Sequence, residues 1–87
     1  MAILVDDPLW PAHGRLWAHL VSDEDLAELH AFARAHDLPA RGFDLDHYDV
    51  PQEMIDRLVA GGAQRVSGKE LVRRLIASGL RVRARDR

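Results

Sequence analysis

Residues 2–5, Ala-Ile-Leu-Val, are apolar at every position and are followed at once by Asp-Asp-Pro. A short run that is apolar on both of its faces is typical of a strand buried in the middle of a sheet. Such a sheet needs helices to cover it. This segment therefore predicts a layered α/β domain.

The rest of the chain alternates between strand and helix patterns. Residues 16–21 predict a second strand, with Trp17, His19 and Val21 on one face. We expect helices at about residues 23–36, 51–60 and 68–78, and short strands at residues 41–45 and 64–66. Because parallel neighbours are joined by crossover helices, the sequence predicts a small, mostly parallel sheet of three to four strands with three helices.

The chain has 87 residues, enough for one domain, which we assign to residues 1–80 with a basic tail at residues 81–87. A domain of this size buries a small fraction of its surface, so we expect a homodimer about as readily as a monomer. The chain has no cysteine, which excludes disulfides and thiolate metal ligands. Its first apolar run is too short for a signal peptide, and no stretch has the length of a membrane span. We therefore expect a cytoplasmic protein without a membrane partner.

The net charge of −2 hides a split between an acidic region and a basic region. Residues 1–63 carry most of the acids, and residues 64–87 carry most of the Lys and Arg. A basic C-terminal helix and tail are typical of a surface that binds nucleic acid. The alternative interpretation is a solvated helix face followed by a frayed tail.

Polar side chains that are candidates for catalysis or ligand binding gather in two predicted loops, residues 6–15 and 44–49. In open parallel sheets, ligands bind beyond the carboxyl ends of the strands. Asp6 and Asp7 follow the first strand, and carboxylates placed there are typical ligands of Mg²⁺ or Mn²⁺. The alternative is that Asp7 makes a turn before Pro8 and that Asp6 caps a neighbouring backbone group.

The tripeptide His47-Tyr48-Asp49 forms the second candidate cluster. His47 has a pKa suited to a general base and is also a candidate metal ligand. Asp49 is a candidate catalytic and metal-binding residue, and its alternative role is the N-cap of the helix that Pro51 begins. Tyr48 is a candidate binding residue or a packing residue.

The first loop and the strand after it supply four further candidates. His13 and His19 are candidate catalytic residues for proton transfer, although His19 fits equally a hydrogen-bonded core histidine. Arg15 carries the planar fork that binds phosphate or carboxylate. Trp10 is a candidate pocket wall that stacks on a nucleobase.

Four stretches of the chain resemble a known family: VDDPLWPAHGRLWAHLVSD at residues 5–23, ELHAFA, DHYDVP and SGKELVRRLIASGLR. Together they are similar to the bacterial and phage family called domain of unknown function 4031. The resemblance spans nearly the whole chain. It implies no activity, but it implies that five residues match positions typical of the family: Asp6, Gly14, His19, His47 and Asp49.

Three functions are compatible with these residues. The first is a metal- or phosphate-binding domain, with a divalent cation, that hydrolyses a phosphodiester of a nucleotide or nucleic acid. The second is a non-catalytic module that binds nucleic acid or a protein through the basic C-terminal helix and tail. The third is a purely structural network of the polar side chains, with no ligand. None of the established phosphate-binding, hydrolase or zinc motifs is present to decide among them.

Overall fold

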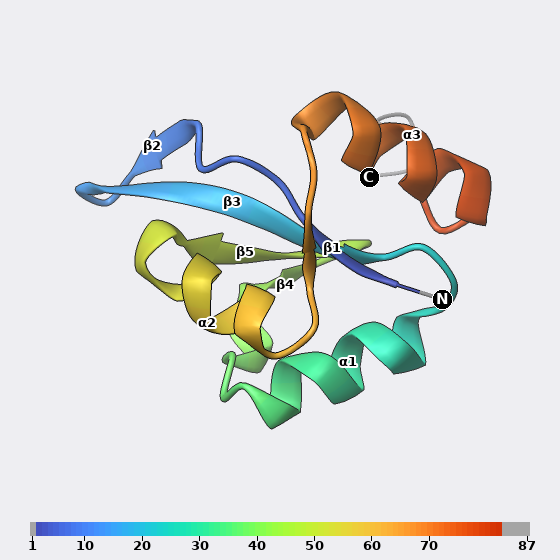
Figure 1. The fold of residues 1–87 in the computed structure, drawn as a ribbon, viewed down its shortest axis with the longest axis horizontal. Coiled ribbons are helices and arrows are strands. Elements are labelled where there is room, and N and C mark those ends of the chain that lie inside the picture. Colours follow the sequence, from blue (N-terminus) through green and yellow to red (C-terminus); the bar gives the residue numbers. More distant parts are fainter. Residues whose placement is uncertain (1, 83–87) are drawn as a thin grey trace.

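The computed structural model describes residues 2–82, and one mixed sheet forms the middle of the molecule (Figure 1). Within these residues its strands are β1 Ile3–Val5, β2 Trp10–Ala12, β3 Arg15–Ser22, β4 Phe43–Asp44, β5 His47–Pro51 and β6 Gln64–Arg65. The strands lie in the order β4-β5-β3-β1-β6, and β2 pairs with the first half of β3.

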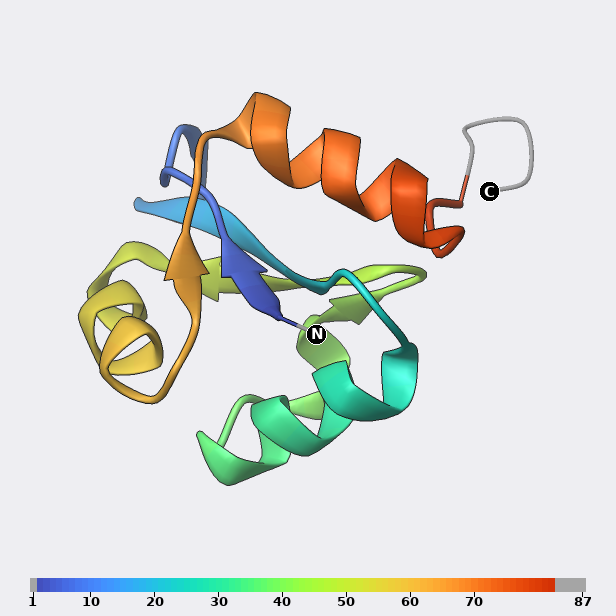
Figure 2. The same ribbon diagram turned by 45° about the vertical axis from the view of Figure 1, so that its right-hand side comes forward.

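Three α-helices cover the two faces of the sheet. They are α1 Leu26–Ala35, α2 Ile55–Ala60 and α3 Gly68–Ser78, and the short 3₁₀ helices η1 Ala40–Gly42 and η2 Gln52–Met54 flank β4 and α2. Figure 2 shows α3 on one side of the sheet and α1 and α2 on the other. The molecule therefore has three layers, with the sheet in the middle.

The prediction of a small, mostly parallel sheet is wrong. The sheet has six strands among the described residues, and only β1 and β6 pair in parallel. The pairs β1–β3, β2–β3, β3–β5 and β4–β5 are antiparallel. The reason is that tight turns reverse the chain between β2 and β3 and between β4 and β5, so that β3 pairs with strands that run against it.

Two tight turns produce these reversals. His13 and Gly14 both have positive φ, of 52° and 75°, which is typical of the turn that fits a two-residue hairpin. Between β4 and β5, Leu45 has φ of 62°, an uncommon conformation for a residue with a side chain. The second turn leaves Asp46 immediately before β5, and its position matters for the site described below.

The core is divided by the sheet, as the alternation of side chains along β3 shows. Ala18 and Leu20 belong to the larger apolar cluster, which contains residues of α1 and α2. Val21 belongs to a smaller cluster with Leu71 and Leu75 of α3. Because side chains two residues apart on a strand share a face, His19 lies on the α3 side of the sheet with Val21.

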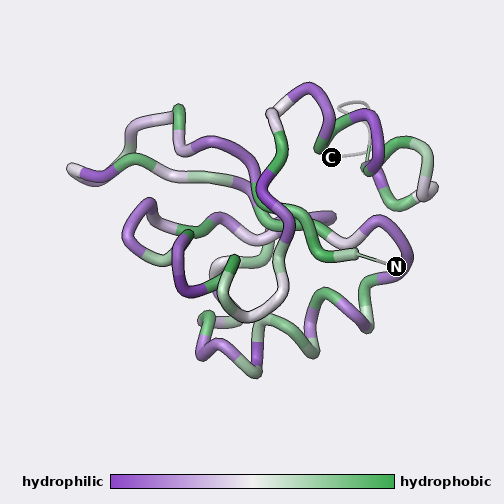
Figure 3. The backbone as a smooth tube through the Cα atoms, viewed as in Figure 1, coloured by the Kyte–Doolittle hydropathy of each residue, from purple (hydrophilic) through white to green (hydrophobic). Residues whose placement is uncertain are grey.

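Hydrophobic residues follow this layered arrangement. In Figure 3, β1 is a hydrophobic stretch in the middle of the molecule, and hydrophobic and hydrophilic stretches alternate along α1 and α3. Within residues 2–82, no helix combines the length and the hydrophobicity that crossing a membrane would require.

Candidate metal centre

His19, His47 and Asp49 come together on the α3 face of the sheet. His19 lies directly opposite Asp49 in the antiparallel β3–β5 pair, and His47 precedes Asp49 by two residues on β5. One nitrogen from each histidine and one oxygen of Asp49 all lie within 4.8 Å of one another. Two imidazoles and one carboxylate are a recurring ligand set of catalytic metal ions.

The imidazole of His19 is oriented by Asp6, which directly follows β1. Oδ2 of Asp6 lies 2.9 Å from Nδ1 of His19, and Oδ1 accepts the backbone N–H of His19 at 2.7 Å. Asp6 is buried, with an exposed fraction of 6%. It therefore caps a backbone group, as the alternative interpretation held, and also fixes the histidine ring, leaving Nε2 free.

The imidazole of His47 lies between two carboxylates. Its Nδ1 is 2.7 Å from Oδ1 of Asp46, which is fully buried, and its Nε2 is 3.0 Å from Oδ1 of Asp49. When Nδ1 carries the ring proton, Nε2 presents a lone pair to Asp49. A nitrogen and an oxygen placed in this way could both coordinate one metal ion.

The C-terminal end of the described chain holds Asp46 in place. Oδ2 of Asp46 accepts the backbone N–H of Val82 at 2.8 Å, and the guanidinium of Arg81 lies 3.6 Å from the same oxygen. Because Asp46 also meets His47, its two oxygens link the β4–β5 turn to the segment that follows α3. The site is therefore built from four separate parts of the chain: Asp6 after β1, His19 of β3, residues 46–49, and residues 81–82.

The pKa of His19 is raised above its ordinary value of 6.5. The hydrogen bond to Asp6 is the main cause, partial burial opposes it, and the charges of Asp6 and Asp49 add to it. The positive charge of Arg81 acts in the opposite direction. These contacts therefore stabilise the protonated form of the His19 ring, chiefly through Asp6.

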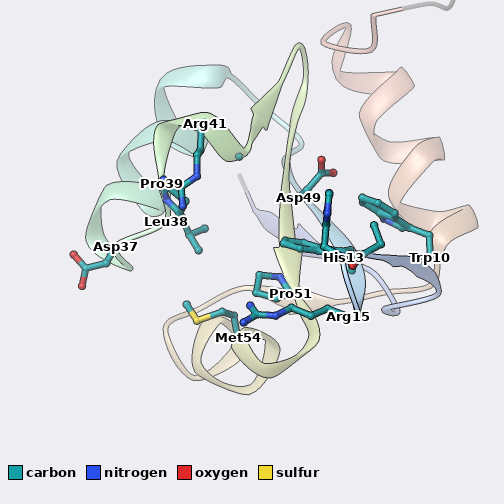
Figure 4. Close-up of a pocket in the computed structure, with 13 residues that line it drawn as sticks. Trp10, His13, Arg15, Asp37, Leu38, Pro39, Arg41, Asp49, Pro51 and Met54 are labelled. Carbon is teal, nitrogen blue, oxygen red and sulfur yellow. Dashed lines mark hydrogen bonds between the residues drawn. The ribbon is translucent and has the colours of Figure 1, made fainter.

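Cavities border the three ligand residues on two sides. A small cavity of about 160 Å³ beneath α3 is lined by His19, His47 and Arg81 together with apolar residues of the core. A larger cavity of about 530 Å³ is lined by Asp49 and extends from the β2–β3 hairpin to the segment after α1 (Figure 4). A ligand in the larger cavity would reach the Asp49 edge of the centre.

Three other predicted residues lie on the larger cavity. Trp10 stacks on both Trp17 and His19, with ring centroids 6.0 Å apart in each pair. His13 lies in the β2–β3 turn and Arg15 directly after it, and Arg15 makes an exposed ion pair with Glu53 at 2.9 Å. Trp10, His13 and Arg15 do not belong to the group of His19, His47 and Asp49 that could hold a metal ion. They are therefore placed to contact a ligand in the cavity.

Two predicted residues lie away from the centre. Asp7 is half-exposed and forms an ion pair with Arg65 at 3.2 Å. Tyr48 is buried on the opposite face of the sheet, where its hydroxyl meets Nδ1 of His30 at 2.7 Å. Tyr48 is therefore a packing residue, as the alternative interpretation held.

Asp49 does not serve as a helix cap. The 3₁₀ helix η2 begins after Pro51, and no side chain caps it. The side chain of Asp49 instead faces His47. The local alternative for this residue is therefore wrong.

Sequence reasoning missed Asp46, Arg81 and Arg41 as site residues. Asp46 had one usable signal: it stands directly before His47 in a stretch rich in acids. Arg81 had none, because only the packing of the segment after α3 brings it to the centre. Arg41, on the larger cavity, was assigned to a strand but belongs to η1.

Residues 3–78 match the family described as protein of unknown function, DUF4031. The chain belongs to the DUF4031 family. The match covers every strand and helix of the described residues, so the resemblance inferred from the sequence is confirmed. No curated protein and no solved structure matches the chain. The function of this DUF4031 protein must therefore be inferred from its own geometry.

Proposed function

We propose that this DUF4031 protein binds a divalent transition-metal ion through His19, His47 and Asp49, and that it hydrolyses phosphate esters with that ion. The protein would bind the ion with Nε2 of each histidine and one oxygen of Asp49. Asp6 and Asp46 would act as positioning residues that hold the two rings.

The observation that carries the proposal is the pairing of each histidine with its own buried carboxylate. Nδ1 of His19 meets Asp6, and Nδ1 of His47 meets Asp46. In metal sites, a ligating histidine almost always donates its other ring N–H to such a partner, which fixes the ring and raises its basicity. One such pair is common, but two that converge on one carboxylate favour a metal centre.

The ligand set also favours particular metals. Imidazole nitrogen suits Zn²⁺, Fe²⁺ and Mn²⁺ better than Mg²⁺, which prefers oxygen and keeps most of its waters. Of the two cations expected from the sequence, Mn²⁺ therefore fits this centre better than Mg²⁺. Zn²⁺ fits best, since two histidines and a carboxylate form a known catalytic zinc site.

Three protein ligands leave a coordination position for water. A bound zinc ion lowers the pKa of such a water to near neutrality and so supplies a hydroxide nucleophile. The cationic side chains of Arg15 and Arg41 line the neighbouring cavity, and they favour an anionic substrate such as a phosphate ester. This combination makes phosphate-ester hydrolysis the reaction that the site supports best.

The test is hydrolysis of bis(p-nitrophenyl) phosphate by the metal-depleted full chain after addition of Zn²⁺, Mn²⁺ or Mg²⁺. We expect turnover with Zn²⁺ or Mn²⁺ and little with Mg²⁺. His47→Ala should abolish turnover, whereas Asp7→Asn, a change in the neighbouring exposed ion pair, should leave it unchanged. Equal residual rates for the wild-type and His47→Ala proteins would refute the proposal.

The basic C-terminal surface has less support as the functional site. Within residues 2–82, four arginines of this surface each form an ion pair with a carboxylate: Arg65, Arg73, Arg74 and Arg81. Fewer of its positive charges are therefore unpaired. The remaining arginines of the expected tail fall at residues 83–87, outside the described part of the chain. Binding to nucleic acid or to a protein there stays a prediction, as do a homodimer and a cytoplasmic location.

A further inference from the structure

We infer that the larger cavity beside Asp49 binds a single nucleoside phosphate, with its phosphate at the Asp49 end and its base against the tryptophan wall. This inference deepens the proposed function, because it rests on the same metal centre and names the class of substrate. Different walls of the cavity would thus contact the phosphate and the base of the same ligand.

The size and shape of the cavity suit one nucleotide. Its volume of about 530 Å³ lies within the range of cavities that hold small organic ligands. In Figure 4, Trp10 and His13 come from the β2–β3 hairpin, whereas Leu38 and Pro39 come from the segment after α1. Asp49 and Pro51 of β5 lie between these walls, so a ligand would be enclosed from both sides.

Aromatic and apolar side chains favour a planar, uncharged group on the ligand. Trp10 and Trp17 line one wall and form a stacked pair, and Met54, Leu38 and Pro39 supply apolar surface. Nucleobases stack on aromatic side chains with a gain of roughly 1–3 kcal/mol per base. Among the described residues, Nε1 of Trp10 is also the one buried side-chain donor without a partner.

Cationic side chains in the same cavity favour an anionic group. Arg41 lines the cavity and has no acidic partner among residues 2–82, so its guanidinium is available to a phosphate. Arg15 is held by an ion pair with Glu53 that is more than half exposed, and such pairs are weak enough to be exchanged. Asp37 lies at the outer end, with its carboxylate pointing away from the other side chains drawn (Figure 4).

The cavity is connected to the metal centre through two residues. Asp49 belongs to both, and Trp10 stacks on His19. A phosphate at the Asp49 end would therefore lie next to the ion, while the attached base remains within reach of Trp10. Nucleotide-sized ligands satisfy both ends at once, whereas a free base or free phosphate satisfies one.

The chain has two tryptophans, and both line this cavity, so their fluorescence reports on it directly. The Zn²⁺-loaded full chain is titrated with adenosine 5′-monophosphate, adenosine, ribose 5-phosphate and a five-nucleotide single strand, with calorimetry in parallel. We expect the monophosphate to bind at least 10-fold more tightly than adenosine or ribose 5-phosphate, and at least as tightly as the strand.

Variants locate the binding within the cavity. Arg41→Ala should weaken binding of the monophosphate by about 10-fold, because it removes a charged hydrogen-bond donor. Arg34→Ala, which changes an exposed arginine of α1 outside the cavity, is the matched control and should leave binding unchanged. Neither change should alter the affinity for Zn²⁺.

Three results would overturn the inference: no binding of the monophosphate at millimolar concentration, equal binding of adenosine, or tighter binding of the strand by 10-fold or more. If Zn²⁺ binds and the nucleotide does not, this inference alone fails. If the nucleotide binds to a chain that shows no heat with Zn²⁺, the cavity assignment stands and the metal proposal fails.

Discussion

At the residue scale, the properties of the centre depend on carboxylates that are not themselves proposed ligands. Asp6 and Asp46 each hold one imidazole by its Nδ1 atom, so that Nε2 of each ring is the nitrogen left for an ion. Both carboxylates are buried, which restricts their motion and strengthens each contact. Changing Asp6 or Asp46 therefore alters the histidine that it holds and leaves that histidine in the site.

Asp6→Asn should therefore weaken Zn²⁺ binding by roughly 10- to 100-fold, the usual cost of losing a hydrogen-bond partner of a metal-bound histidine. It should also lower the pKa of His19 in the metal-free protein, because Asp6 is the main cause of its upward shift. Calorimetry measures the affinity, and NMR titration of the imidazole measures the pKa.

Asp7→Asn is the matched control for Asp6→Asn. It makes the same chemical change at the next residue, in an ion pair with Arg65 outside the centre. Equal loss of Zn²⁺ affinity in the two variants would contradict a specific role for Asp6.

The pH dependence of metal binding follows from the raised pKa of His19. A proton on this ring competes with the ion, and the raised pKa keeps that proton bound to a higher pH than for an ordinary histidine. Zn²⁺ affinity should therefore fall as the pH is lowered through the pKa of His19 and level off above it. Calorimetry between pH 5.5 and 8.5 tests this, and a flat profile would exclude His19 as a ligand.

Several residues of the site were predictable one by one, but their contacts were not. His19, His47, Asp49 and Asp6 were identified as candidates because acids and imidazoles are unusual beside apolar strands. Their meeting point depends on the β3–β5 register, which places His19 opposite Asp49. Register between strands nearly thirty residues apart leaves no local signal in the sequence, and the role of Asp46 depends on a turn without glycine.

At the element scale, the predicted elements were mostly correct but their pairing was not. The first strand, the second strand with the face that carries His19, and the helix at residues 68–78 were predicted. β2 was missed because it contains Pro11, which an edge strand tolerates. Residues 46–50 were assigned to a loop and Pro51 to the start of a helix, although His47–Pro51 is the strand β5 that carries two of the three proposed ligands.

The ends of three elements are joined by Asp23. Its carboxylate accepts the backbone N–H of Ala2 at 2.8 Å and the guanidinium of Arg74 at 2.6 Å, which ties the start of β1 and the end of β3 to α3. Burial alone would raise the pKa of Asp23, but the hydrogen bonds to Arg74 and Ala2 hold it below its ordinary value of 3.8.

Asp23→Asn should lower the free energy of unfolding by about 2 kcal/mol near neutral pH, because it replaces the charged acceptor of the Ala2 and Arg74 hydrogen bonds with a neutral amide. A depressed carboxyl pKa contributes stability above the ordinary pKa, and that contribution is lost as the pH falls through the folded-state value. The difference between wild-type and variant proteins should therefore shrink below about pH 4. Urea denaturation at pH 7 and pH 3 measures it, and a difference that is independent of pH would contradict this assignment.

At the scale of the whole molecule, residues 2–82 form one layered domain, and the centre lies on the face of the sheet that α3 covers. The proposed ligands come from β3 and β5, while their positioning carboxylates follow β1 and precede β5. The segment after α3 closes over Asp46. An ion bound here would therefore hold together strands that meet only in the folded state.

Zn²⁺ should accordingly raise the melting temperature of the chain. At a free concentration about 100 times its dissociation constant, an ion that binds the folded state alone adds about 2.7 kcal/mol. For a domain of this size, that corresponds to roughly 10–20 °C. Differential scanning calorimetry measures the shift, which His47→Ala should abolish. A melting temperature independent of Zn²⁺ would support the purely structural network instead.

The most direct test of the account is ¹⁵N NMR of the histidine rings, recorded before and after one equivalent of Zn²⁺. Five histidines are present, so His13, His30 and His36 serve as internal references. We predict that Nε2 of both His19 and His47 shifts to a metal-bound value while their Nδ1 atoms keep protons. Unchanged spectra, or shifts confined to the three reference histidines, would contradict the metal centre.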